Sequence, residues 1–192
     1  MKIFYNGCSW TSGRLDTNEE ETYPKILFKN LGGSYVNIAK AGASNQRILR
    51  TTYENCDESF DLAIIQMTFK DRFEFASELR KDGYISLLPN KLFKNKDSKE
   101  SILFKEIFYR HFYTETYGDA VEKVCFQALS DYFYRIKVPV ILTTINHRST
   151  LPFHLKIIPK DYSLDSTYHP NKLGHNMLAK TFLKKIEQCL NL

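Results

Sequence analysis

Short apolar segments alternate with segments of helical character along this chain, and this alternation constrains the fold more than any other feature of the sequence. A helix is expected over about Glu21–Leu31, between the first two apolar segments. Strands that alternate with helices predict a parallel sheet covered on both faces. We therefore expect an α/β fold, a three-layer α/β/α sandwich, with strands at Lys2–Tyr5, Ser34–Ile38, Asp61–Met67 and Lys137–Thr143.

The end of the chain is predicted to form one more helix, which closes the fold. Pro170 is expected in its first turn, where proline is favoured because no N–H is needed at that position. Apolar residues then recur at helical spacing, at Leu173, Met177, Leu178, Phe182 and Ile186. A helix with this pattern should bury one face against the sheet.

Length and composition predict one domain over residues 1–192, since 43% of the residues are apolar and can form a sizeable core. The third and fourth strands are separated by far more residues than one crossover helix requires. We therefore expect an insertion at about residues 71–117. Its aromatic segment Ile102–Tyr117 has two interpretations, a helix core or a surface that faces a substrate.

Charge and cysteine content limit the classes of partner. The formal charge of +5 is a mild excess that demands no nucleic acid, so none is expected. The four cysteines lie far apart and predict neither a zinc site nor a disulfide framework. A signal peptide and a membrane span are not expected either. These features predict a cytoplasmic protein with no membrane partner, and they leave its oligomeric state open.

The opening segment, MKIFYNGCSWTSG, places Ser9 on a glycine turn after the first strand. A serine hydroxyl becomes a useful nucleophile only when a histidine takes its proton, a carboxylate orients that histidine and donors await the oxyanion. Without such partners, a plain structural turn is the better interpretation. The segment also lacks the second glycine of a G-x-S-x-G elbow, because position 11 is threonine.

The segment LDSTYHPNKLGHNMLA offers a candidate base near the other end of the chain. His169 directly precedes Pro170, so it is expected at a strand–helix junction on the sheet edge where the Ser9 turn also lies. Asp165 can reach the imidazole if the loop folds back. Capping of the helix start is an equally simple use of both residues. His175 is the weaker candidate, since it lies one turn inside the helix.

The segment VNIAKAGASNQRI offers candidate oxyanion donors after the second strand. Its small residues let a backbone N–H approach a ligand closely, and Gly42 is the candidate for that contact. The side chain of Asn45 can add a second donor or can cap the following helix. Both uses of Asn45 stay open.

These three segments, in this order, resemble the SGNH hydrolase family, also called GDSL-type esterases and lipases, over nearly the whole chain. Ser9 matches the family's nucleophile block, Gly42 its second block and His169 its final block. The resemblance implies a flavodoxin-like sandwich and a catalytic triad that needs no metal or organic cofactor. GCSWTSG with NIAKAGASN is similar to divergent members that bacteriophages and other viruses encode, which would place the protein in a host cytoplasm.

Two blocks depart from the family pattern near the nucleophile and after the third strand. Cys8 stands where the first block usually has aspartate. The third block should read like G-x-N-D but reads IIQMTFKDR. Gln66, Thr68 or Asn45 would then take the place of its oxyanion donor.

The final block departs from D-x-x-H, because Ser166 lies three residues before His169. Asp165 would then be the acid, with one extra residue in the turn, or the acid is absent. Each departure is compatible with an altered substrate, an altered reaction or a loss of activity.

The resemblance implies a serine esterase that removes an acyl group, such as acetyl, from a small or carbohydrate-like ester through an acyl-enzyme. An O-acyltransferase results if a sugar or nucleotide hydroxyl replaces water. The alternative from another class is a non-catalytic protein that binds a ligand or partner on the same scaffold, since fold does not determine function.

Overall fold

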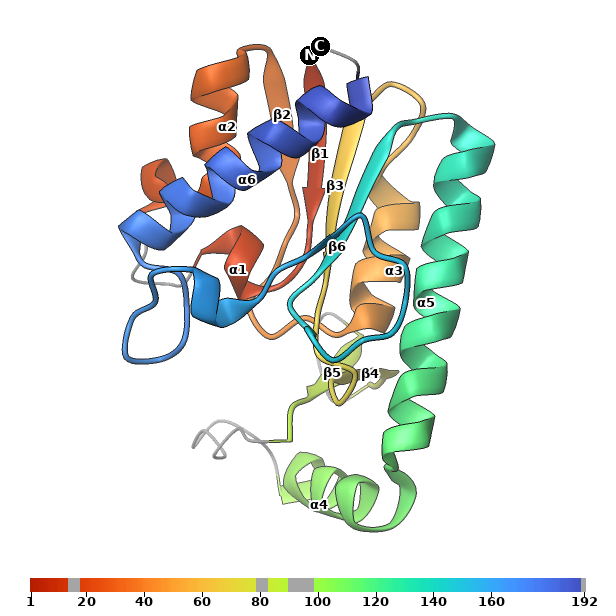
Figure 1. Cartoon of the computed structure of the whole chain (residues 1–192). Helices are drawn as coiled ribbons and strands as arrows, with labels where there is room; N and C mark the ends of the chain where they lie inside the picture. The colour runs from red at the N-terminus through yellow and green to blue at the C-terminus, as the bar shows by residue number, and fades with distance from the viewer. Residues whose placement is uncertain (14–17, 79–82, 90–98, 191–192) are drawn as a thin grey trace.

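A five-stranded parallel sheet forms the centre of the protein (Figure 1). The computed structural model describes residues 1–13, 18–78, 83–89 and 99–190. The strand order is β2-β1-β3-β6-β7, which confirms the predicted α/β fold and its flavodoxin-like layout. The strands are β1 (Lys2–Asn6), β2 (Ser34–Asn37), β3 (Leu62–Met67), β6 (Val140–Thr144) and β7 (Leu155–Lys156).

Helices cover both faces of this sheet, as the alternation predicted. On one face α2 packs against α6, and the ring of Tyr23 stacks on that of Phe182 at 4.8 Å between centroids. On the other face α3 packs against α5. The four helices are α2 (Tyr23–Leu31), α3 (Asn45–Asn55), α5 (Glu115–Ile136) and α6 (Lys172–Leu190).

The core is organised around the central strand. All six residues of β3 are buried, as expected for a continuous apolar run between two neighbouring strands and two helical layers. All five strands run in the same direction, so their carboxyl ends gather at one edge of the sheet. The short helix α1 (Ser9–Ser12) lies at that edge, whereas the start of β1 and the end of α6 lie at the opposite end (Figure 1).

The start of α6 differs from the prediction. The helix begins at Lys172, whereas Pro170 forms an isolated antiparallel bridge with Leu164. Asn171 acts as the cap, because its Oδ1 accepts a hydrogen bond of 3.0 Å from the backbone N–H of Gly174. The fourth predicted strand also starts later, at Val140.

The predicted insertion contains a hairpin that was not predicted. Antiparallel strands β4 (Phe73–Ala76) and β5 (Tyr84–Leu87) are followed by α4 (Lys99–Ile107) and a π-helical segment, Phe108–Phe112. Residues 79–82 and 90–98 of the insertion lie outside the described residues. The described part lies beyond the carboxyl ends of the strands (Figure 1).

The aromatic segment Ile102–Tyr117 is partly a buried core and partly an exposed surface. Phe108 is buried in a small apolar cluster with Phe73, Ile85 and Leu87 of the hairpin. Phe112, by contrast, is 66% exposed. One side of the segment is therefore a local core and the other faces outward.

All four cysteines are free thiols. Within the described ranges, no helix combines the length and the apolar character that crossing a membrane requires. The same residues contain no group of three or more His, Cys, Asp or Glu side chains placed to hold a metal ion.

Candidate functional site

Ser9 lies at the carboxyl end of β1, at the first residue of α1. The turn before it requires glycine, since a Cβ on Gly7 would lie 2.6 Å from Thr11 Oγ1 and 2.9 Å from Gln66 Cβ. The Cys8 carbonyl accepts the first hydrogen bonds of α1, so Ser9 is held in helical backbone. Its side chain is therefore presented from a rigid corner, and Ser9 is only 5% exposed.

The structure brings Ser9 and His169 together across 160 residues of sequence. The distance between Ser9 Oγ and His169 Nε2 is 2.9 Å, that of a hydrogen bond. His169 belongs to the segment between β7 and α6, which also packs on α1 through an edge-to-face contact of Tyr162 with Trp10. The two chain segments are thus joined by both a polar and an aromatic contact.

The segment that carries His169 is held closely against the start of α6. Asn171 donates to Ser163 from its backbone N–H at 3.2 Å and from its side chain at 2.9 Å. A Cβ on Gly174 would lie 2.1 Å from the Ser163 carbonyl oxygen, so only glycine permits this approach. The position of the imidazole is therefore tied to the first turn of α6.

The second ring nitrogen of His169 determines which tautomer the structure favours. Nδ1 lies 2.9 Å from the backbone carbonyl oxygen of Thr167. A carbonyl oxygen can only accept, so Nδ1 carries the proton in this contact. Nε2 is then free to accept the hydrogen bond from the Ser9 hydroxyl. This is the tautomer that a general base next to a serine requires.

Asp165 is close to His169, but its carboxylate bonds to the backbone of the turn. Oδ1 accepts from the backbone N–H of His169 at 3.1 Å and from the N–H and hydroxyl of Thr167 at 2.7 and 2.5 Å. Among the described residues, the imidazole itself bonds to Ser9 and Thr167. Thr167 was not predicted as a site residue, although Asp-Ser-Thr is typical of a turn closed by side-chain bonds.

Gly42 lies in a tight turn that is fastened to the Ser9 corner. The N–H of Lys40 donates to the carbonyl of Gly7 at 3.0 Å, and the N–H of Ala43 donates to the carbonyl of Lys40 at 3.0 Å. Gly42 has a φ of +78°, a left-handed conformation that favours glycine. The structure therefore brings the Gly42 segment next to the Ser9 segment.

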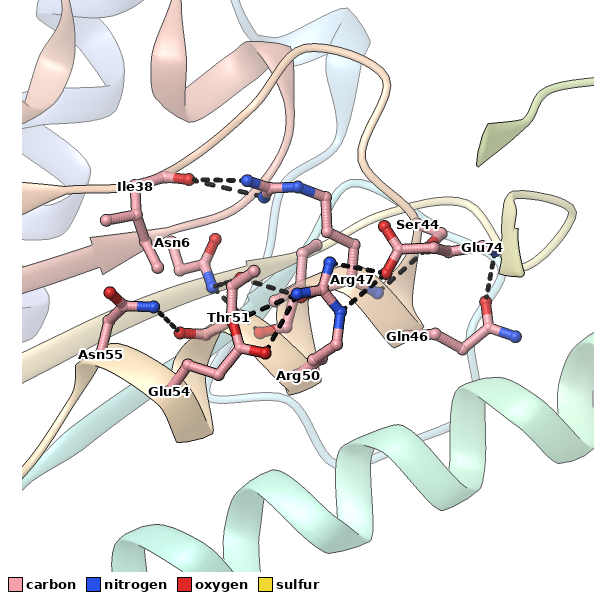
Figure 2. Close-up of polar contacts among 11 residues, drawn as sticks. Asn6, Ile38, Ser44, Gln46, Arg47, Arg50, Thr51, Glu54, Asn55 and Glu74 are labelled. Carbon is pink, nitrogen blue, oxygen red and sulfur yellow. Dashed lines mark hydrogen bonds and ion pairs between the residues drawn. The ribbon is translucent and has the colours of Figure 1, made fainter. Parts of the chain in front are cut away.

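Helix α3 begins directly after this turn and is hydrogen-bonded to both ends of the loop that contains it, as Figure 2 shows. Ser44 is the N-cap, since its hydroxyl accepts a bond of 3.1 Å from the N–H of Arg47. The guanidinium of Arg47 also donates to the carbonyl of Ile38, at the other end of the loop. The side chain of Asn6, at the end of β1, donates to Thr51 on the same helix. These bonds fix the loop between β2 and α3.

Of the three other candidate donors, only Asn45 has its side-chain donor group paired within the described part of the protein. Asn45 does not cap α3; its amide instead bonds to both backbone groups of Thr68, accepting at 2.8 Å and donating at 3.2 Å. Gln66 Oε1 accepts from Thr11 Oγ1 at 2.8 Å and from Cys8 Sγ at 3.4 Å. The side chains of Gln66 and Thr68 are fully buried, and Gln66 Nε2 and Thr68 Oγ1 have no hydrogen-bond partner among the described residues.

His175 lies away from the serine and has a structural contact. It is 1% exposed, and its Nδ1 accepts a bond of 3.3 Å from the backbone N–H of Tyr23, the first residue of α2. Burial lowers the pKa of His175 to about 4, so the ring is neutral at pH 7. This residue joins α6 to the start of α2.

No protein-family model matches this sequence, and neither does any curated protein; similarity is found only to solved structures. The esterase EstA from Pseudoalteromonas sp. is 12% identical with a TM-score of 0.57, and the match covers 100% of this chain and 99% of that chain. A carbohydrate esterase is 11% identical with a TM-score of 0.58, covering 97% of this chain and 68% of that one. A mutant of the acetylxylan esterase Axe2 from Geobacillus stearothermophilus is 15% identical with a TM-score of 0.52, covering 96% and 93%.

These matches concern the fold. The five-stranded parallel sheet with its flanking helices matches the folds of these esterases at low sequence identity.

Proposed function

We propose that this protein is a serine esterase that removes an acyl group from a small or carbohydrate-like ester through an acyl-enzyme. The observation that carries the proposal is the 2.9 Å contact between Ser9 Oγ and His169 Nε2 at the carboxyl edge of the sheet. The tautomer of His169 supports this proposal. The Thr167 carbonyl holds the ring proton on Nδ1, so Nε2 is available to take the Ser9 hydroxyl proton.

In the first half of the reaction, Ser9 Oγ attacks the ester carbonyl carbon while its proton moves to His169 Nε2. The carbonyl oxygen becomes an oxyanion, which the N–H groups of Ser9 and Gly42 are proposed to bind. Collapse of this intermediate breaks the bond to the alcohol oxygen. The alcohol leaves with the proton from Nε2, and the acyl group remains on Ser9.

In the second half, water attacks the acyl-enzyme and gives a proton to His169 Nε2. Collapse of the second intermediate releases the carboxylic acid, and Nε2 returns the proton to Ser9 Oγ. The imidazole is a cation in each intermediate, so acceptors at Nδ1 stabilise it. Thr167 supplies the nearest acceptor, its backbone carbonyl.

The substrate class is proposed from two sources. The neighbours in fold include an acetylxylan esterase and a carbohydrate esterase, which makes an acetylated carbohydrate a natural first substrate. The insertion supplies an aromatic rim beyond the strand ends. Its hairpin is tied to α3, because Arg50 donates to the Glu74 carboxylate and the backbone N–H of Glu74 donates to Gln46 Oε1 (Figure 2).

A fluorophosphonate probe tests the proposed chemistry directly. We expect the wild-type protein to be labelled at Ser9, because labelling requires an activated serine. The Ser9→Ala variant should stay unlabelled, and so should a heat-denatured sample. Mass spectrometry of the labelled peptide identifies the site. Absence of label on the folded wild-type protein would contradict an activated Ser9.

A non-catalytic binding protein is the second candidate, favoured by the placement of the Asp165 carboxylate on backbone N–H groups. The matched carbohydrate esterase has itself been described as having divergent catalytic and non-catalytic binding functions. This candidate predicts no labelling but saturable binding of an acetylated oligosaccharide. An O-acyltransferase predicts labelling, and transfer to an added sugar that exceeds hydrolysis.

We further propose that the insertion sets substrate choice. Replacing the exposed Phe112 by alanine should change the ratio of kcat/KM for p-nitrophenyl butyrate and acetate by about tenfold, as expected for apolar contacts to an acyl chain. The matched control is Tyr134→Ala, since Tyr134 is 86% exposed at the far end of α5. Equal ratios in both variants and the wild type would show that Phe112 does not contact the substrate.

A further inference from the structure

The turn from Asp165 to His169 places one hydroxyl between a carboxylate and the imidazole. Thr167 Oγ1 lies 2.5 Å from Asp165 Oδ1 and 3.2 Å from His169 Nδ1. An ionised carboxylate only accepts, so the single hydroxyl proton of Thr167 is directed to Asp165. Oγ1 then faces the imidazole as an acceptor.

We propose that Thr167 is a positioning residue that connects Asp165 to His169, in place of the direct carboxylate contact that the sequence analysis expected. Nδ1–H is shared between two acceptors of the same residue, the Thr167 carbonyl at 2.9 Å and its hydroxyl at 3.2 Å. This inference rests on the proposed function, because it assigns Thr167 a role in holding the base of that reaction.

The turn is held by bonds that leave the ring little freedom. Asp165 Oδ1 accepts three hydrogen bonds from Thr167 and His169, and Asp165 N–H donates to the His169 carbonyl at 2.8 Å. Tyr168, between them, has a φ of +60°, which non-glycine residues rarely adopt. Such a conformation persists where the surrounding bonds over-determine it, and it directs the Thr167 carbonyl towards the ring two residues later.

The arrangement predicts how charge is shared during the reaction. When His169 takes the serine proton, Nδ1–H becomes a stronger donor, and both acceptors of Thr167 stabilise the cation. Asp165 acts through Thr167, because its negative charge polarises the Thr167 hydroxyl that faces the imidazole. Thr167 contacts the imidazole, whereas the Asp165 carboxylate bonds to the backbone N–H of His169. The loss of the Thr167 hydroxyl should therefore cost more than the loss of the Asp165 charge.

The test compares four variants with the wild type in kcat and KM for p-nitrophenyl acetate. Thr167→Val keeps the shape and the carbonyl, and we expect kcat to fall by about tenfold with KM nearly unchanged, the size of one bond to a charged group. Thr167→Ser restores the hydroxyl and should stay within about twofold of wild type. Asp165→Asn should lose less than Thr167→Val, because its amide oxygen still accepts. Ser166→Ala is the matched control, a hydroxyl in the same turn.

A spectroscopic measurement keeps this test independent of esterase activity. Nitrogen-15 NMR of the neutral His169 ring should show the proton on Nδ1 in the wild type and in Thr167→Ser, with a larger share on Nε2 in Thr167→Val. If the wild type neither hydrolyses esters nor reacts with fluorophosphonate, the proposed function fails, and the NMR comparison still judges the Thr167 contact. The inference is overturned if Thr167→Val matches Ser166→Ala in both the kinetics and the spectrum, or if Thr167→Ser does not restore them.

Discussion

Replacing Ser9 by alanine should lower kcat for p-nitrophenyl acetate by at least about 10⁴-fold, the loss seen when a nucleophile that works with its base is removed. The reason is specific to this corner of the protein. The Ser9 hydroxyl is bonded to the only imidazole that reaches it among the described residues, and without Oγ no acyl-enzyme can form. The residual rate of Ser9→Ala should be the rate that substrate binding and backbone N–H donors alone provide.

Stability distinguishes this loss from a loss of fold. Within the described part of the chain, Ser9 makes one side-chain hydrogen bond, whose removal costs about 1 kcal/mol, so the melting temperature should fall by only a few degrees. Ser12→Ala is the matched control, since Ser12 lies in the same short helix and its hydroxyl donates to the Gly13 carbonyl. Hydrolysis that survives in Ser9→Ala at the wild-type rate would remove Ser9 from the mechanism.

Replacing His169 by alanine should be almost as damaging, with kcat/KM lower by about 10⁴-fold, because the hydroxyl then has no base to take its proton. His175→Ala should behave in the opposite way. Its rate should stay close to wild type, whereas unfolding should require about 1–3 kcal/mol less, since the N–H of Tyr23 loses its buried acceptor.

Both histidine variants should be measured in one assay together with thermal unfolding. Position decides between the two rings, since His169 contacts Ser9 and His175 contacts the start of α2. The assignment is abandoned if His175→Ala, with its fold intact, loses more activity than His169→Ala.

The sequence alone determined the parallel α/β fold of this protein, because buried strands require runs of apolar residues that can be recognised in the sequence. A central parallel strand is covered on both faces, so β3 is apolar apart from Gln66, and DLAIIQM could be recognised without a structure. Parallel strands end at one edge, so Ser9 and His169 could be expected there from their places after the first strand and before the last helix. The structure places them within hydrogen-bond distance.

The hairpin was not predicted because its signal is weak in the sequence. Strands β4 and β5 have four residues each; β4 buries only Phe73, and β5 buries only Ile85 and Leu87. Their apolar side chains pack against Phe108 and its neighbours rather than the main core, so no long apolar run marks them. Segments that bury only a small local cluster depend on contacts far along the chain, which residue order does not display.

Only the tertiary structure decided which groups surround the candidate base. Sequence spacing permitted Asp165 to reach the imidazole, but the left-handed backbone at Tyr168 closes a turn in which the carboxylate takes backbone N–H groups and Thr167 faces the ring. Asn45 likewise bonds to Thr68, twenty-three residues away, rather than capping its own helix. Residue types define which hydrogen bonds are possible, whereas backbone torsions and packing select among them, and a difference of one residue in a turn is enough to change the partner.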